Sequence, residues 1–450
     1  MTTHVLMISH EAPGPRMSGP AIRYWHLAEV LAREFPVVLA IPGEPTASGS
    51  GFEVQGYRRQ DGYPLLTLTA KADVIITAGF LLYHYPFLKE TGKPLVVDLY
   101  DPFILETLVI HRDKPIQTQI DINTINLAVL NEQLKLGDFF LCAHEAQRDF
   151  WLGMLAANGR INPLTVASDP TLDRLIAIVP FGLPDEPPCH KRRVLKGVYP
   201  GIGDEDKVIY WGGGIWEWFD PLTAIRAVAE VAQVYPRVRL FFAGTKHPNP
   251  DVPPMRMCDM ARHLSDTLGL TNRVVFFNEW VEYEERENYL LEADIGISLH
   301  FKQVETRFSF RTRLLDYIWA GLPMIVTQGD AISELVAKHN LGVVVEPGDW
   351  VGVRDAILEL LGQPHFREQA EPRFVAARAG LTWQEAAAPL LAFCRQPYRA
   401  ADRYPLPKVK KAKVSPRPPV VVRAWQTFRR KGVMGLVGAI RDYLRWRATA

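Results

Sequence analysis

Short runs rich in β-branched and aromatic residues alternate with helical patterns along most of this chain of 450 residues. HVLMIS (residues 4–9) reads as a strand and FPVVLAI (35–41) as the next one, while IRYWHLAEVLARE (22–34) between them has apolar residues at helical spacing. This succession is typical of parallel sheets whose strands are joined by helices. The sequence therefore predicts the α/β class, with doubly wound parallel sheets.

The alternation is interrupted once, by residues 184–206, which are rich in Pro, Gly and charge and are expected to form an interdomain linker. It restarts at KVIYWGG (207–213) and ends with VRDAILELLG (353–362). We therefore expect two Rossmann-like domains facing a cleft, residues 1–190 and residues 191–398, the second with a return helix. Because ligands of open parallel sheets bind beyond the carboxyl ends of the strands, the loops there are the candidate sites.

The end of the chain, residues 399–450, differs in charge from the rest. From Arg403 onward there are 13 Lys or Arg and one acidic residue. The whole chain has 51 basic and 50 acidic residues, so the body, residues 1–402, has 38 basic and 49 acidic residues. PKVKKAKVSPRPP (407–419) has the composition of a linker, and basic residues alternate with aromatic ones beyond it. Residues 408–447 are expected to bind an anionic membrane surface or to form a solvated, disordered extension. Nucleic acid is a less favoured partner.

The composition of the body gives no sign of secretion or of membrane crossing. Its four cysteines are widely separated, without the spacing of a disulfide framework or a metal site. The N-terminus lacks the pattern of a signal peptide, and no apolar run approaches the roughly 18 residues of a spanning helix. We expect a cytoplasmic protein, peripheral at the inner face of the membrane if its tail binds lipid.

Candidate ligand-binding groups follow two expected strands of the first domain. Gly19 lies between the first strand and the first helix, where backbone N–H groups can approach an anion; the alternative is a turn without a ligand. Asp98 and Asp101 come at the end of PLVVDLY (94–100) and are candidates for catalysis. Asp98 lies within the apolar run, so it is expected to pair with an Arg or a backbone N–H group. The alternative for Asp101 is a helix cap ahead of Pro102.

A glycine turn opens the second domain. WGGGIWEWFDP (211–221) places Gly213 and Gly214 after a strand, where a phosphate can reach the backbone. Trp216, just beyond them, could stack on a sugar or form a wall of the cleft.

An arginine-rich loop later in the second domain is the other candidate site. SFRTRLLDYIWAGLP (309–323) places Arg311 and Arg313 at the start of an apolar helix, and paired guanidinium groups there suit a phosphate. Asp316 lies one turn further and could accept hydrogen bonds from ribose hydroxyls, or simply pair with an arginine. The alternative for both arginines is surface ion pairing with Glu305 or Asp316.

These segments resemble the glycosyltransferases of the GT-B fold, and within them a variant branch of the retaining family four, over residues 3–398. The most specific match is LLDYIWAGLPMIVT (314–327) followed by GDAISELV (329–336), and VPFGLP (179–184) is similar to the family's segment before its second domain. The resemblance implies that a nucleotide sugar binds to the second domain. It assigns Asp316 to the ribose and Trp280 to the edge of the base. Thr312 and Glu334 are assigned to the rest of the nucleotide sugar.

Three positions depart from the family pattern. Phe308 stands where the family often has a glutamate, Tyr100 stands where it has a histidine, and residues 211–221 contain no basic residue. We therefore expect the two arginines of the 309–323 loop to supply the charge that binds the diphosphate. The two aspartates at the end of PLVVDLY are expected to contact the sugar or the acceptor.

The resemblance implies transfer of a sugar from a nucleotide diphosphate sugar to an acceptor hydroxyl, with retention of configuration. The acceptor class expected is a glycan or a lipid-linked glycan of the cell-surface polysaccharide type. The resemblance also implies an enzyme that needs neither a metal nor a cofactor. Two alternatives remain open, a non-catalytic GT-B subunit that binds carbohydrate and a GT-B epimerase that acts on a nucleotide sugar.

Overall fold

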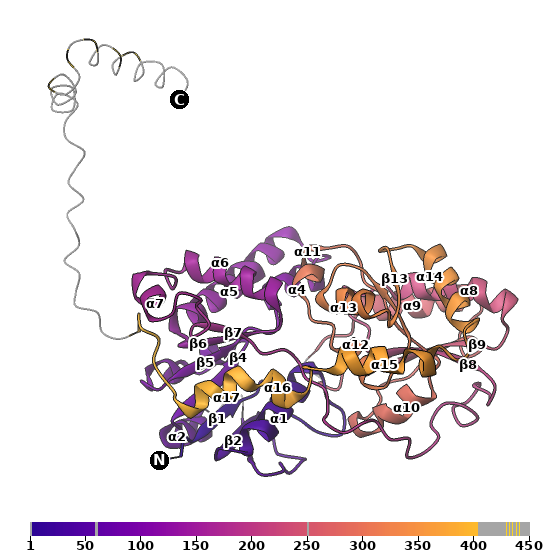
Figure 1. Cartoon of the computed structure of the whole chain (residues 1–450), viewed down its shortest axis with the longest axis horizontal. Coiled ribbons are helices and arrows are strands. Elements are labelled where there is room, and N and C mark those ends of the chain that lie inside the picture. The colour runs from indigo at the N-terminus through magenta and orange to yellow at the C-terminus, as the bar shows by residue number, and fades with distance from the viewer. Residues whose placement is uncertain are drawn as a thin grey trace. The chain divides into compact units, whose positions relative to one another are not determined.

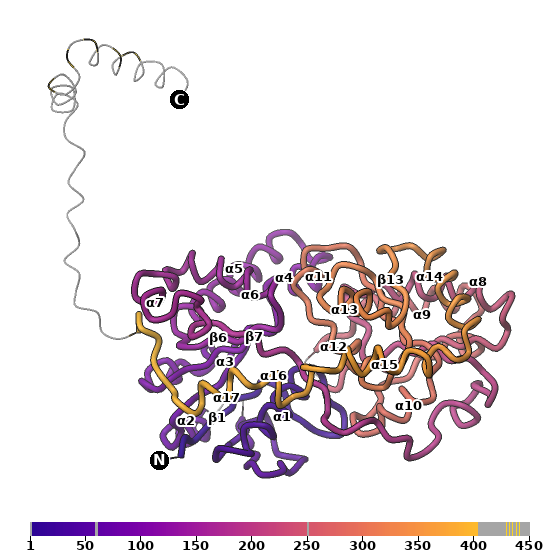
Figure 2. The backbone as a smooth tube through the Cα atoms, in the orientation of Figure 1, coloured from indigo at the N-terminus to yellow at the C-terminus, as the bar shows by residue number. Residues whose placement is uncertain are grey.

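The structure is a computed structural model that describes residues 2–58, 62–249 and 252–403, with five isolated positions beyond them. Residues Met1–Arg403 form one compact unit, which contains two parallel sheets with their helices (Figures 1 and 2). The membrane-binding prediction for residues 408–447 lies outside the described residues. In the described part of the chain, no helix has the length and apolar character needed to cross a membrane.

The first domain is built on a seven-stranded sheet of order β3-β2-β1-β4-β5-β6-β7, in which every neighbouring pair is parallel. Its strands are β1 (Val5–Ile8), β2 (Val37–Pro42), β3 (Glu53–Tyr57), β4 (Val74–Ala78), β5 (Leu95–Asp98), β6 (Phe139–Cys142) and β7 (Ile176–Ile178). The helices between them are α1 (Gly19–Ala32), α2 (Tyr63–Lys71), α3 (Leu81–His84), η1 (Pro86–Glu90), α4 (Phe103–Ile110), α5 (Ile116–Leu136), α6 (Glu145–Ala157) and α7 (Pro163–Ser168).

The second domain is built on a six-stranded parallel sheet of order β10-β9-β8-β11-β12-β13. Its strands are β8 (Lys207–Gly214), β9 (Val238–Gly244), β10 (Val275–Phe277), β11 (Ile295–Ser298), β12 (Met324–Thr327) and β13 (Gly342–Val345). Its helices are α8 (Pro221–Val234), α9 (Arg256–Thr267), η2 (Tyr283–Glu285), α10 (Arg286–Glu292), α11 (Val304–Phe308), α12 (Thr312–Trp319), α13 (Ala331–His339), α14 (Trp350–Leu361) and α15 (Phe366–Arg378). The predicted fold class is thereby confirmed.

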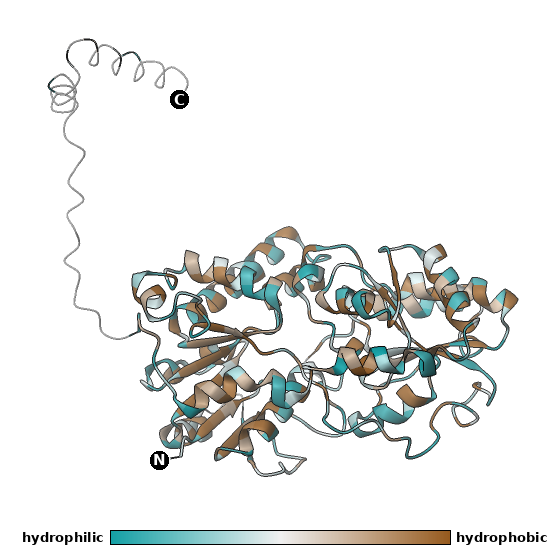
Figure 3. Ribbon diagram, in the orientation of Figure 1, coloured by the Kyte–Doolittle hydropathy of each residue, from teal (hydrophilic) through white to brown (hydrophobic). Residues whose placement is uncertain are grey.

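The central strands are buried on both faces because helices cover both sides of each sheet. All residues of β1, β5, β11 and β12 are buried, and Figure 3 shows the strands of the first domain's sheet in the brown of hydrophobic residues. Continuous apolar runs such as VLMI are therefore what a doubly wound parallel sheet requires.

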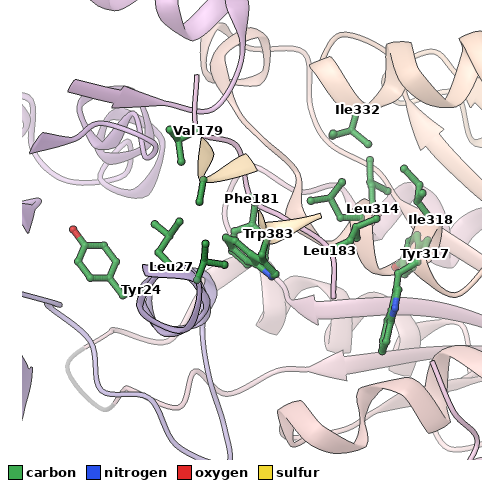
Figure 4. Packing of buried hydrophobic residues seen from close by; sticks show 14 of the residues in the cluster. Tyr24, Leu27, Val179, Phe181, Leu183, Leu314, Tyr317, Ile318, Ile332 and Trp383 are labelled. Carbon is green, nitrogen blue, oxygen red and sulfur yellow. The ribbon is translucent and has the colours of Figure 1, made fainter. Parts of the chain in front are cut away.

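The chain returns to the first domain through α16 (Trp383–Ala386) and α17 (Ala388–Arg395). Phe393 stacks on Phe139 of β6 with ring centroids 4.8 Å apart, and Trp383 packs against Phe181 at 4.6 Å (Figure 4). Backbone hydrogen bonds join Leu183 to Leu381 and to Trp383. These contacts pack the expected return helix against the first domain.

The expected linker is part of the core. Val194, Leu195 and Ile202 are buried, and the backbone N–H groups of residues 194–196 donate to the Glu292 carboxylate. Its Pro, Gly and charged residues had indicated only a connecting segment, because its few apolar residues follow no regular period.

Candidate functional site

A cavity of about 240 Å³ lies between the two domains, at the carboxyl ends of their strands. Its wall from the first domain includes Gly19, Asp101 and Glu106, and its wall from the second includes Trp216 and the start of α12. The loops identified in the sequence therefore face one another, as expected for two sheets of this kind.

Arg313 is the cation on this wall that lacks a counter-charge. Its Nη2 atom donates to the carbonyl oxygen of Gly214 at 2.6 Å, and its guanidinium lies 3.9 Å from the centroid of the Phe219 ring. Its Nη1 atom is buried without a hydrogen-bond partner, and no carboxylate among the described residues forms an ion pair with it. Burial lowers the pKa of Arg313 to about 10. A desolvated cation of this kind is prepared to receive an anion.

Arg311 differs from Arg313, although it lines the same cavity. Its Nη2 atom lies 2.7 Å from Oε2 of Glu305, and the two side chains are only 5% and 1% exposed. The expected alternative, a surface ion pair with Glu305, therefore exists as a buried pair. The expectation that both arginines offer their charge to a diphosphate needs correction, because Glu305 balances the charge of Arg311.

Thr312 and the helix α12 complete this wall. Thr312 is the first residue of the helix and lines the cavity. No side chain caps α12, so its amino-terminal end is suited to a negative charge.

Asp316 lines a second, smaller cavity of about 90 Å³, together with Gly213 and Trp280. Its partner is Arg286, whose Nε atom lies 3.4 Å from Oδ1 of Asp316. Arg286 is held by cation–π contacts with Tyr283 at 3.6 Å and with Trp319 at 4.9 Å. The alternative that Asp316 pairs with an arginine is therefore confirmed, but its partner is Arg286 and not an arginine of its own loop. Nothing in the sequence spacing indicated Arg286.

The two tryptophans expected near the nucleotide sugar are linked through His247. Trp216 stacks on Trp218 with centroids 5.1 Å apart, and His247 contacts Trp216 at 5.3 Å and Trp280 at 5.6 Å. His247 follows β9 and had no motif to indicate it.

The glycine turn supports these rings. Gly213 has φ +73°, a conformation that glycine adopts without strain. A Cβ atom on Gly214 would lie 3.3 Å from the Trp280 ring, so the turn allows that ring to approach the backbone closely.

Asp98 is held by Arg23, which confirms the expected pairing with an arginine. The Nε and Nη2 atoms of Arg23 donate to the two carboxylate oxygens at 2.7 and 3.0 Å, and the side chains are 0% and 2% exposed. Arg23 also donates to the Pro180 carbonyl oxygen at 3.0 Å. The pair therefore fastens α1 to β5 and to the segment between the domains.

Asp101 does not cap the following helix, so that alternative is wrong: α4 has no side-chain cap. Instead its side chain forms a hydrogen bond with that of Glu106. Burial raises the pKa of Asp101, and burial together with the nearby Asp101 charge raises the pKa of Glu106 well above its usual range. Two carboxyl groups this close share a proton. Glu106 gave no signal in the sequence, because one acidic residue in a short helix usually faces solvent.

Gly19 and Glu334 have different surroundings. Gly19 lines the interdomain cavity, and a Cβ atom there would lie 3.1 Å from the hydroxyl of Tyr100. Glu334 is exposed in the first turn of α13, whose start is capped by Asp330, and it lies outside the cavities described above. No group of three His, Cys, Asp or Glu side chains in residues 2–403, apart from the two short gaps, is placed to hold a metal ion.

Comparison with known proteins agrees with this arrangement. The family of glycosyl transferases group 1 matches residues 206–363, which make up most of the second domain. Among curated proteins, none matches the sequence significantly.

Solved structures match both domains. Sucrose-phosphate synthase from Thermosynechococcus elongatus has 15% identity and a TM-score of 0.59, covering 88% of this chain and 98% of that one. HepE from Anabaena, in complex with UDP-glucose, has 13% identity and a TM-score of 0.59, with 87% and 100% covered. WaaG, a glycosyltransferase involved in lipopolysaccharide biosynthesis, has 16% identity and a TM-score of 0.59, with 86% and 98% covered. The chain therefore has the GT-B fold, and its residues 206–363 match the family of glycosyl transferases group 1.

Proposed function

We propose that this protein transfers a sugar from a nucleotide diphosphate sugar to an acceptor hydroxyl. The observation that carries the proposal is the buried guanidinium of Arg313, which has no carboxylate partner among the described residues and faces the interdomain cavity. A diphosphate beside it would supply the missing counter-charge and accept hydrogen bonds from its free Nη1 atom.

The donor extends across two cavities of the second domain in this proposal. Its diphosphate lies against Arg313 and the start of α12, and its ribose lies at Asp316. Gly213 supports this placement because it lines the smaller cavity and lies next to Gly214, whose carbonyl holds Arg313. Trp280 would border the base.

The chemistry then rests on stabilising the leaving group. As the bond between the anomeric carbon and the diphosphate breaks, negative charge grows on the phosphate oxygens next to Arg313. A fixed cation in a desolvated site stabilises this charge most effectively. We therefore propose a reaction that needs neither a metal nor a cofactor. The proposal of retained configuration rests on the resemblance to the retaining family.

The acceptor would bind in the first domain, where Asp101 and Glu106 face the donor side of the cleft. A glycan or a lipid-linked glycan is proposed as the acceptor. The basic residues 408–447 would bring the protein to the cytoplasmic face of the membrane, where lipid-linked acceptors lie.

Thermal unfolding with a panel of nucleotide sugars, beginning with UDP-glucose, tests donor binding, because a ligand that binds only the folded chain raises the midpoint. NMR analysis of the products then tests the reaction. A new glycosidic bond with the donor's configuration is expected. A nucleotide sugar epimerised without any acceptor, or bound without turnover, would contradict sugar transfer.

A further inference from the structure

The first domain contains a cavity of about 450 Å³ at the carboxyl ends of β1, β4 and β5. This volume lies within the range of about 300–1,000 Å³ typical of small-molecule sites. A third of the residues that line it are phenylalanine or tyrosine, namely Tyr24, Tyr57, Phe80, Tyr85, Tyr100 and Phe103. Flat aromatic faces suit the apolar face of a sugar ring.

This cavity and the interdomain cavity meet. His10, Pro20, Tyr100 and Asp101 line both of them. An occupant of the larger cavity could therefore place a hydroxyl group where the donor sugar is proposed to lie. Asp101, hydrogen-bonded to Glu106, stands at that junction.

The charge of the larger cavity argues against an anionic occupant. Among the described residues that line it, Arg23 is the single Lys or Arg, and Asp98 binds it through both carboxylate oxygens. The other acidic residue on the wall is Asp101. Apart from its two histidines, His10 and His84, the wall therefore has no cationic side chain available for a phosphate, which usually requires one.

One buried hydroxyl in this wall lacks a partner. The Tyr24 side chain is 2% exposed, and its Oη atom has no hydrogen-bond partner among the described residues. Figure 4 shows this hydroxyl turned away from Leu27 and Val179, which pack against the rest of the cluster. Burial raises the pKa of Tyr24 well above its usual value, so the group remains a donor. Buried polar groups are rarely left unpaired unless a ligand or water completes them.

We infer that the larger cavity binds the acceptor as an uncharged sugar ring and discriminates against phosphorylated sugars. The aromatic residues of the wall contact the sugar ring. The Tyr24 hydroxyl and the Asp101–Glu106 pair form hydrogen bonds with the hydroxyl groups of the sugar. The wall offers a phosphate no free lysine or arginine. Identifying the bound sugar as the acceptor rests on the proposed function, but the binding preference can be measured without turnover. A lipid-linked glycan agrees with this inference if the sugar at its reacting end is uncharged and its phosphates remain outside the cavity.

Isothermal titration calorimetry on the full chain provides the test. The ligands are phenyl glycosides of glucose, galactose, mannose and N-acetylglucosamine, and the 6-phosphates of the same sugars, each with and without UDP. At least one neutral glycoside should bind about tenfold more tightly than every sugar phosphate. A sugar phosphate that binds most tightly, or a panel in which nothing binds, would overturn the inference.

Tyr24→Phe removes the unpaired hydroxyl and keeps the ring. It should weaken binding of the neutral glycoside about fivefold, as expected for one lost hydrogen bond. Tyr83→Phe, at a tyrosine that is 53% exposed, is the matched control. Equal affinities for the Tyr24→Phe and unmodified proteins would contradict the assignment. UDP binding in the same titrations reports on the donor site separately, so failure of the proposed function is distinguishable from failure of this inference.

Discussion

The guanidinium of Arg313 donates a hydrogen bond of 2.6 Å to the carbonyl oxygen of Gly214. This contact joins the start of α12 to the glycine turn at the end of β8. It uses one terminal nitrogen of Arg313 and leaves the other without a partner. The position of the turn therefore determines where the cation is presented.

Gly213→Ala should disturb this arrangement through the backbone. Residue 213 has φ +73°, which costs about 1–2 kcal/mol for a residue with a Cβ atom. The added methyl group meets no atom closer than 3.9 Å, so the cost is conformational. We expect a lower free energy of unfolding in urea and a higher KM for the donor.

Gly153→Ala is the control for that substitution. Gly153 lies within α6 with open space around its Cα atom, and alanine there should stabilise the helix by about 0.5–1 kcal/mol. If Gly213→Ala and Gly153→Ala change the free energy of unfolding equally, a side chain at residue 213 does not strain the turn.

Glu305→Gln should destabilise the fold strongly, because it leaves the buried Arg311 without its charge partner. Loss of one member of such a pair costs about 3–5 kcal/mol, measurable by urea unfolding. Glu132→Gln, in the more exposed pair with Lys89, should cost at most about 1 kcal/mol. The double variant Glu305→Leu with Arg311→Met should recover much of the loss. If it does not, the pair has a role beyond balancing charge.

The Asp101–Glu106 pair should make stability depend on pH. Because both carboxyl pKa values are raised in the folded chain, the folded chain holds more protons than the unfolded chain above about pH 4. The free energy of unfolding should therefore fall as pH rises through the raised pKa values.

Glu106→Gln removes one of the two acids and should make that fall shallower between about pH 5 and 8. Urea unfolding across this range checks the slope, with Glu205→Gln, at an exposed glutamate, as the control. A steeper slope in Glu106→Gln would contradict the shared proton.

Much of the fold was predictable from the sequence, because strands buried on both faces appear as continuous apolar runs. VLMI and LVVD are entirely buried. The strand β3 was not predicted, because EVQGY has one buried residue, Tyr57, and lies at the edge of the sheet. The helix α5 was also missed, since its buried face includes the polar side chains of Asn126 and Gln133.

The sequence indicated which loops form the site, but not which side chains pair with one another there. The positions of Asp98, Asp316 and Arg313 follow from local pattern and resemblance, whereas their partners come from other parts of the chain. Arg23 lies 75 residues from Asp98, and Arg286 lies 30 residues from Asp316. Such pairings depend on tertiary packing, which no local period encodes.

The central claim is that Arg313 supplies the charge that stabilises the departing diphosphate. Steady-state turnover of the nucleotide sugar identified by thermal unfolding should be compared for the unmodified protein, Arg313→Ala and Arg307→Ala, with urea unfolding to verify that each variant folds. Arg307 lies in the preceding helix α11 and is exposed, so it controls for lost positive charge. The account predicts that Arg313→Ala lowers kcat/KM by more than about tenfold and that Arg307→Ala leaves it nearly unchanged. Unchanged turnover in a folded Arg313→Ala protein would contradict it.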